Sequence, residues 1–110
     1  MRKIDRFDGD FDFLSNFFPA DVRFDGILYP SSEAAFQAQK CFKNDDKLQF
    51  THLTPGQAKR LGRKIYMRHD WEDIKVDVMT RIVRAKFTQH EVLGNLLYRT
   101  GDAELIEGNT

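Results

Sequence analysis

The sequence contains a single cysteine, Cys41, so it can form no internal disulfide and no cysteine-based metal site. Such sparing use of cysteine is typical of proteins from a reducing compartment. The apolar runs fall far short of the roughly 20 residues that span a bilayer. The charged N-terminal residues are followed by no apolar segment of the kind found in signal peptides. From these absences we expect a cytoplasmic protein with no membrane partner.

An excess of charge of either sign is also missing, because 17 basic residues balance 17 acidic ones. A chain with no overall field is not predisposed toward nucleic acid or acidic membranes. The sequence has no glycine-rich phosphate loop. Its histidines (His52, His69 and His90) have neither metal-ligand spacing nor a serine motif beside them. A zinc site and a hydrolytic triad are therefore disfavoured, and we expect neither a metal nor a cofactor.

Phenylalanine, by contrast, is abundant, with ten copies in 110 residues. Six of them lie in the first quarter of the chain: Phe7, Phe11, Phe13, Phe17, Phe18 and Phe24. Packing in the core is the commoner use of such residues, and stacking on a flat ligand ring is the alternative. Hydrophobic residues make up 41% of the chain and charged residues 31%, which is a globular composition, and the length predicts one domain.

The N-terminal third predicts short strands. Residues 4–7 and 11–14 have the character of extended segments, separated by an Asp-Gly-Asp turn. Residues 22–29 give the clearest hairpin signal, because Asp25-Gly26 between two apolar arms suits a type I′ turn. Near the other end of the chain, residues 103–107 alternate polar and apolar side chains and predict a short edge strand.

The middle of the chain predicts helices. The first begins at Ser31 or Ser32, either of which can cap it, and good helix formers continue to about Phe42. Residues 43–47 then read as a polar break. Residues 48–53 are ambiguous and fit one or two further helical turns.

A strong helix start follows that ambiguous segment. Thr54 is suited to the N-cap, Pro55 to the first helical position, and Gln57 lies three residues after the cap. This pattern predicts a helix that runs to about Leu61, with Gly62 as its natural end.

The longest periodic segment begins at Trp71, where apolar residues four apart predict an amphipathic helix of about four turns that ends near Thr88. A further helix is predicted over residues 92–97 and closed by Gly101. With the strands, these segments predict an α+β fold: a single domain in which a small antiparallel sheet packs with a cluster of about four to six helices.

Glu33, Gln37 and Lys40 fall at i, i+4 and i+7 of the first predicted helix, so they share one face. A carboxylate, an amide and an amine on one face suit the wall of a site. They also suit an ordinary solvated surface, because an acid in the first turn and a base in the last complement the helix dipole. Spacing alone favours the solvated surface.

Five basic residues with no acid among them fall within ten positions: Lys59, Arg60, Arg63, Lys64 and Arg68. Such a cluster either binds phosphate or forms a solvated face, and the solvated face is the commoner outcome. Trp71, at the start of the periodic segment, is most often a core residue.

Three blocks together carry a family resemblance. Leu-Ser-Asn-Phe at residues 14–17 is followed by Tyr-Pro-Ser-Ser-Glu at residues 29–33 and by Gln-Ala-Gln-Lys at residues 37–40. In this order and spacing they resemble the NADAR family of YbiA-like N-glycosidases. The likeness continues through residues 58–63 and several single positions as far as residues 105–107, so it covers nearly the whole chain.

The resemblance implies a hydrolase that cleaves N-glycosidic bonds in ADP-ribose-linked or phosphoribosyl-like compounds. Family members are linked to ADP-ribosylated guanine in nucleic acid and to reactive intermediates of riboflavin synthesis. Carried onto this chain, the resemblance implies Glu33 as a catalytic carboxylate and Lys40 as a candidate Schiff-base nucleophile. The expected ligand-binding residues are Ser15, Asn16, Phe17, Tyr29, Gln37, Lys59, Arg63 and Trp71.

One feature departs from the family pattern. The family continues past the Leu-x-Glu segment into a tail with Trp, Asp and a closing Trp-Gly, whereas this sequence ends at Thr110. The expectation is therefore a single NADAR-like domain over residues 1–110 that lacks this tail. Its alternative function is a binding module that holds ADP-ribose or a nucleotide without cleaving it, and a partner-binding scaffold is a third possibility.

Overall fold

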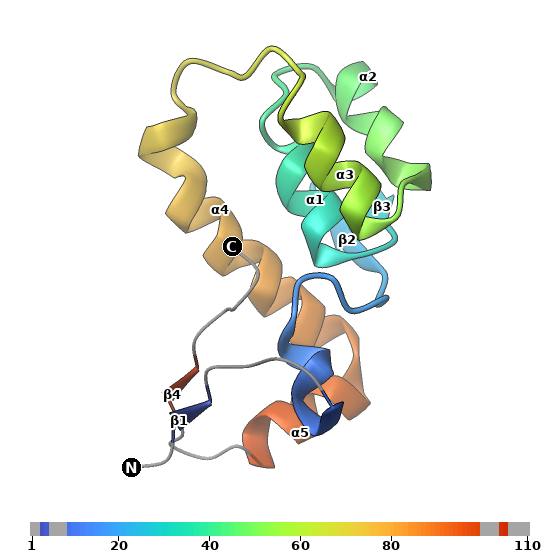
Figure 1. Cartoon of the computed structure of the whole chain (residues 1–110), viewed down its shortest axis with the longest axis vertical. Coiled ribbons are helices and arrows are strands. Elements are labelled where there is room, and N and C mark those ends of the chain that lie inside the picture. The colour runs from blue at the N-terminus through green and yellow to red at the C-terminus, as the bar shows by residue number, and fades with distance from the viewer. Residues whose placement is uncertain (1–2, 5–8, 100–103, 106–110) are drawn as a thin grey trace.

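The computed structural model describes residues 3–4, 9–99 and 104–105. The long helix α4 (Trp71–Gln89) runs diagonally through the molecule in Figure 1. Helix α1 (Ser32–Ala38) packs on α4, and α3 (Pro55–Gly62) packs on α1. A β-hairpin lies along the C-terminal half of α4, and α5 (Glu91–Arg99) packs with α4 beyond its end. The predicted α+β class is confirmed.

The hairpin pairs β2 (Val22–Phe24) with β3 (Ile27–Tyr29) in antiparallel register, Val22 opposite Tyr29. Its two turn residues both have positive φ, 49° at Asp25 and 85° at Gly26, as a type I′ turn requires. The prediction of this hairpin from Asp-Gly is confirmed. Val22 and Tyr29 are fully buried, so the hairpin contributes one face to the core beneath α1.

Helix α1 begins as predicted but ends early. Ser31 caps it by accepting a hydrogen bond from the Ala34 amide at 3.1 Å. The α-helix stops at Ala38, so the predicted extension to about Phe42 is wrong. The chain tightens there into i→i−3 turns, and the Lys40 carbonyl accepts from the Arg68 amide at 2.8 Å instead of continuing the helical ladder. Lys40 therefore lies beyond the helix, not on its face.

Two other expectations are wrong. Residues 11–14 are not extended: they belong to η1 (Gly9–Leu14), a 3-10 helix whose last turn is followed by a Ser15-to-Asp12 backbone bond of 3.0 Å. Phe13 and Leu14 are consecutive and both buried, whereas consecutive residues of a strand point to opposite faces. The polar break at 43–47 contains a short helix, α2 (Asn44–Lys47), whose acidic first turn and basic last residue suit the helix dipole.

The remaining segments follow the sequence signals. Residues 48–53 contain the 3-10 helix η2 (Leu48–His52). Helix α3 has a complete capping box between Thr54 and Gln57, as predicted. Short strands β1 (Lys3–Ile4) and β4 (Glu104–Leu105) pair in parallel. The rest of the predicted strands at 4–7 and 103–107, and Gly101, lie outside the described residues.

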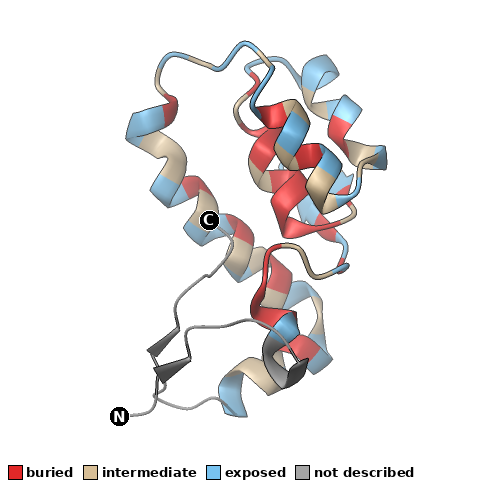
Figure 2. Cartoon of the chain, viewed as in Figure 1, coloured by how far each residue is buried: buried red, intermediate tan, exposed pale blue. Residues whose placement is uncertain are grey.

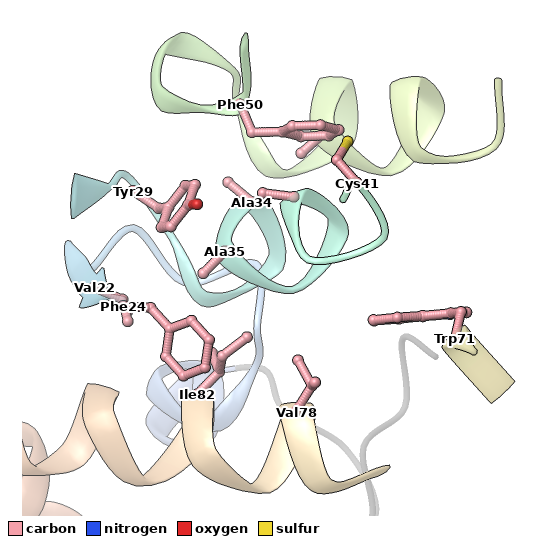
Figure 3. Close-up of a cluster of buried hydrophobic side chains, with 12 residues drawn as sticks. Val22, Phe24, Tyr29, Ala34, Ala35, Cys41, Phe50, Trp71, Val78 and Ile82 are labelled. Atoms are coloured by element: carbon pink, nitrogen blue, oxygen red, sulfur yellow. The ribbon is translucent and has the colours of Figure 1, made fainter. Parts of the chain in front are cut away.

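Two hydrophobic clusters contact α4 at different positions along its length. The larger one gathers buried residues from the hairpin, α1, η2 and α3 over Val78 and Ile82, as Figure 3 shows. The second packs Phe13 and Leu14 against α5 and Phe87. Buried positions in Figure 2 concentrate on α1 and on the side of α4 that faces it. The loop formed by residues 15–17 crosses between these clusters.

None of the helices in the described ranges combines the length and the apolar character that crossing a bilayer requires.

Candidate active site

A pocket of about 390 Å³ opens where this loop, α1, α3 and α4 come together. Its apolar lining includes Phe17, Phe36 and Met79. Polar groups come from Asn16, Glu33 and Gln37, and two cationic groups come from Lys59 and Lys75; Val76 and Thr80 complete the lining. A mainly apolar hollow with a few converging polar groups is the usual form of a small-molecule site.

Glu33 places a carboxylate in the pocket from the first turn of α1. Its side chain is only 6% exposed, and Oε2 accepts a hydrogen bond from Gln37 Nε2 at 3.3 Å. Its amide donates to the Asn16 carbonyl at 3.0 Å, which satisfies one of the free N–H groups at the helix start. The same helix end favours negative charge, so the site is suited to a carboxylate.

The loop of residues 15–17 is held on several sides. The Ser32 hydroxyl lies 3.0 Å from Asn16 Oδ1 and 3.2 Å from the Asn16 carbonyl oxygen. Asn16 Nδ2 donates to Met79 Sδ at 3.5 Å, which ties the loop to α4. Ser15 Oγ accepts from the Phe17 amide at 3.0 Å. Ser15 thus braces the loop from outside the pocket, whereas Asn16 and Phe17 line it.

Gln37 has an unused acceptor. The residue is 6% exposed. Among the buried side-chain nitrogen and oxygen atoms in the described part of the chain, Gln37 Oε1 alone has no hydrogen-bond partner. An unpaired buried acceptor costs stability unless a donor arrives. Oε1 is buried against Gly62 of α3, so in this arrangement Gln37 acts on the pocket through Nε2, which holds the Glu33 carboxylate.

Lys40 lies beside the pocket but does not line it. Its Nζ donates to the carbonyl of Gly62 at 3.3 Å, and the side chain is half-buried. Burial lowers the pKa of Lys40 from its ordinary value of 10.5; Glu33 acts in the opposite direction, and Arg63 lowers the pKa further. The amine is therefore easier to deprotonate than a surface lysine.

The other expected ligand-binding residues lie outside the lining. Tyr29 is fully buried in the core, where its hydroxyl accepts from Gln39 Nε2 at 3.3 Å and burial raises its pKa. Trp71 is also buried and packs against Phe36, with ring centroids 5.0 Å apart, so it supports a pocket residue from behind. Arg63 is exposed at the end of α3. The structure thus brings together five of the ten expected residues: Asn16, Phe17, Glu33, Gln37 and Lys59.

Sequence reasoning missed the contribution of α4. Lys75, Met79 and Thr80 line the pocket together with Val76, although the periodicity of this segment indicated only an amphipathic helix. The side of α4 next to its buried residues forms this wall of the pocket. The i, i+4 spacing of Lys75 and Met79 was the available signal.

Within the described residues, no group of three or more His, Cys, Asp or Glu side chains is placed to hold a metal ion.

The family model of the NADAR domain matches residues 5–110. The chain is 39% identical over 102 residues to the N-glycosidase YbiA of Escherichia coli, an alignment that covers 90% of this chain and 62% of that protein. It is 46% identical over 100 residues to a riboflavin biosynthesis protein of Vibrio vulnificus, covering 86% of this chain and 27% of that protein.

The solution NMR structure of E. coli YbiA has the same fold, with a TM-score of 0.82 and 34% sequence identity. This match covers 97% of the present chain and 68% of YbiA. The chain therefore spans between about a quarter and two thirds of the length of these relatives.

Proposed function

The chain belongs to the NADAR domain family, and from this premise we propose that it is an N-glycosidase that hydrolyses the bond between a ribosyl anomeric carbon and a nitrogen. The proposed substrates are ADP-ribose-linked or phosphoribosyl-like compounds. The observation that carries the proposal is the buried Glu33 carboxylate in the pocket, held there by the Gln37 amide. Relatives named as N-glycosidases support it.

Glu33 has the chemistry that such a cleavage needs. As the carbon–nitrogen bond breaks, positive charge develops at the anomeric carbon, and a nearby carboxylate stabilises it. The bonding electrons leave with the nitrogen, water adds to the anomeric carbon, and a water proton passes to the departing nitrogen. In this route Glu33 stabilises the developing cation and orients the water.

Lys40 offers a second route within the same proposal. Its neutral amine attacks the anomeric carbon, and the nitrogen of the base departs with the bonding electrons and takes one proton from the amine. The bond from the anomeric carbon to the ring oxygen then breaks, the oxygen takes the second amine proton, and a Schiff base forms. Water then hydrolyses the Schiff base and regenerates the amine. The lowered pKa of Lys40 favours this chemistry. To reach the pocket, however, Nζ has to leave the Gly62 carbonyl and turn toward Glu33.

The rest of the pocket suits a phosphorylated ribosyl compound. Phe17 and Phe36 provide ring faces for a base. Lys59 and Lys75 provide positive charge for phosphate. Lys59 Nζ already lies 5.7 Å from the centre of the Phe17 ring, so base and phosphate sites are adjacent.

The proposal is tested by incubating the protein with DNA that carries ADP-ribosylated guanine and, separately, with a phosphoribosyl-amine intermediate of riboflavin synthesis. Chromatography then measures free ADP-ribose or free ribose phosphate. We expect release from at least one substrate and none from the Glu33→Gln variant. Failure to release product from either substrate would contradict the proposed activity.

One observation favours a second candidate, a module that binds the same compounds without cleaving them. The Lys40 amine is held by a backbone carbonyl and lies outside the pocket lining. Calorimetry with ADP-ribose separates the two functions. Binding without release from either substrate supports the module, whereas release supports the enzyme.

A further inference from the structure

A second lysine, on α4, is buried more deeply than any group of the pocket. Lys86 is 1% exposed, and its Nζ donates to the carbonyl oxygens of Phe13 at 2.5 Å and Ser15 at 2.9 Å. The ring centres of Phe18 and Phe87 lie 5.5 and 5.1 Å from the same Nζ. Burying an ammonium is unfavourable unless such partners receive its charge. A burial of this kind calls for an explanation.

The two carbonyls mark a particular place in the chain. Phe13 lies in the last turn of η1, where carbonyls without a helical partner point out and favour a cation. Ser15 is the residue at which the chain leaves η1 and turns into the pocket. Lys86 therefore binds the start of the loop, immediately before the two residues that line the pocket, Asn16 and Phe17.

The far side of the same loop is bonded to α1 and α4. The Asn16 carbonyl accepts from the Glu33 amide, and the Asn16 side chain contacts Met79. Met79 and Lys86 are seven residues apart, two turns along one face of α4. The same face of α4 therefore contacts the loop at two places, through Met79 at the pocket and through Lys86 at the start of the loop.

We propose that Lys86 is a positioning residue of the pocket: its ammonium, bound to the Phe13 and Ser15 carbonyls, fixes the loop that carries Asn16 and Phe17 against α1. Asn16 and Phe17 hold the substrate only in this arrangement. The link to substrate rests on the proposed function, whereas the link to loop geometry stands without it.

The first test is amide hydrogen exchange in Lys86→Met, which keeps the length of the side chain and removes its charge. We expect exchange of the Glu33 amide, bonded to Asn16, to quicken at least about tenfold more than that of the Ala58 amide in α3. Lys64→Met, at an exposed lysine, is the matched control and should change neither amide. Equal changes at Glu33 and Ala58, or none, would overturn the proposal.

A second measurement needs no substitution and covers the case in which Lys86→Met does not fold. Nitrogen-15 NMR of the lysine side chains should find one ammonium, Lys86, whose protons exchange with water at least about tenfold more slowly than those of exposed lysines. Fast exchange at Lys86 would show that its hydrogen bonds do not persist, and the proposal would fail.

Steady-state kinetics test whether the position of the loop affects substrate binding. If the protein is the proposed glycosidase, Lys86→Met should raise KM about tenfold while kcat falls by less, because Asn16 and Phe17 bind substrate and Glu33 reacts. A drop in kcat with KM unchanged would contradict the assigned role. If no activity exists, only this measurement is lost, and the exchange experiments still decide the role of Lys86 in the loop.

Discussion

Gly62 of α3 lies so close to Gln37 of α1 that a Cβ atom at position 62 would fall 2.0 Å from Gln37 Oε1. Both residues are buried at the contact between the two helices. Gln37 in turn donates to Glu33 across one turn of α1. The absence of a side chain at position 62 therefore sets where the amide beside the proposed catalytic carboxylate can lie.

Gly62→Ala should displace the Gln37 side chain and break its 3.3 Å bond to Glu33. We expect a loss of about 1–3 kcal/mol in the free energy of unfolding, as for other overpacked sites, measured by urea denaturation. Gly56→Ala in the same helix is the matched control, because its nearest neighbour would be 4.0 Å away and alanine favours the helix. Equal stability of the two variants would contradict the close contact.

Glu33→Gln should remove turnover and leave the fold intact. The amide is nearly the same size as the carboxylate but carries no charge to stabilise the anomeric cation, so we expect kcat to fall by about 10²–10³-fold. Release of ribosyl product measures kcat, and circular dichroism measures the fold. Glu91→Gln, at the exposed start of α5, is the control and should retain full activity. Turnover of Glu33→Gln close to that of the unsubstituted protein would exclude the assigned role.

The Schiff-base route makes Lys40 the site of a covalent adduct. Borohydride added during turnover should reduce the adduct, and mass spectrometry should find the sugar on the peptide that contains Lys40. Lys40→Met should form no adduct and lose turnover, whereas Lys47→Met should behave as the unsubstituted protein. If Lys40→Met still turns over substrate, the reaction proceeds through Glu33 and water alone.

The lowered pKa of Lys40 also predicts a pH dependence of stability. Because burial lowers the pKa in the folded state below the ordinary 10.5, protonation of Lys40 opposes folding at neutral pH. This opposition disappears as the pH rises from the folded-state pKa toward 10.5. The stability of Lys40→Met relative to the unsubstituted protein should therefore decrease between pH 7 and pH 10 in urea denaturation. A constant difference would show that the amine titrates normally.

Lys75 should contribute to phosphate binding from α4. Its side chain lines the pocket and forms an ion pair with Glu72 at 2.5 Å. Lys75→Met should raise KM for a phosphorylated substrate by about tenfold, with little change in kcat, and added salt should reduce the difference. An unchanged KM would place the phosphate elsewhere.

The parts of the fold that were predictable from sequence rest on local chemistry. The Asp25-Gly26 turn and the Thr54 capping box are set by the conformations of a few consecutive residues, and both are confirmed. The end of α1 was not predictable, because the Lys40 carbonyl is taken by an amide 28 positions away, that of Arg68. Such a contact exists only once the chain has folded.

The pocket residues also divide into those predictable from local sequence and those that depend on how the helices pack. Asn16, Phe17 and Glu33 were found through the family resemblance, which local motifs carry. Lys75 was not found because which flank of an amphipathic helix borders a hollow depends on the packing of its neighbours. Lys86 was likewise hidden, since a lysine in a helix gives no sign from sequence that it is buried.

The contact between Trp71 and Phe36 gives the molecule a built-in optical signal. The chain has one tryptophan, so its intrinsic fluorescence at long wavelength comes from a single place. That indole lies with its ring centre 5.0 Å from the ring of a residue that lines the pocket. Occupation of the pocket should therefore change the emission of Trp71, and unlabelled compounds can be ranked by titration before any product is assayed.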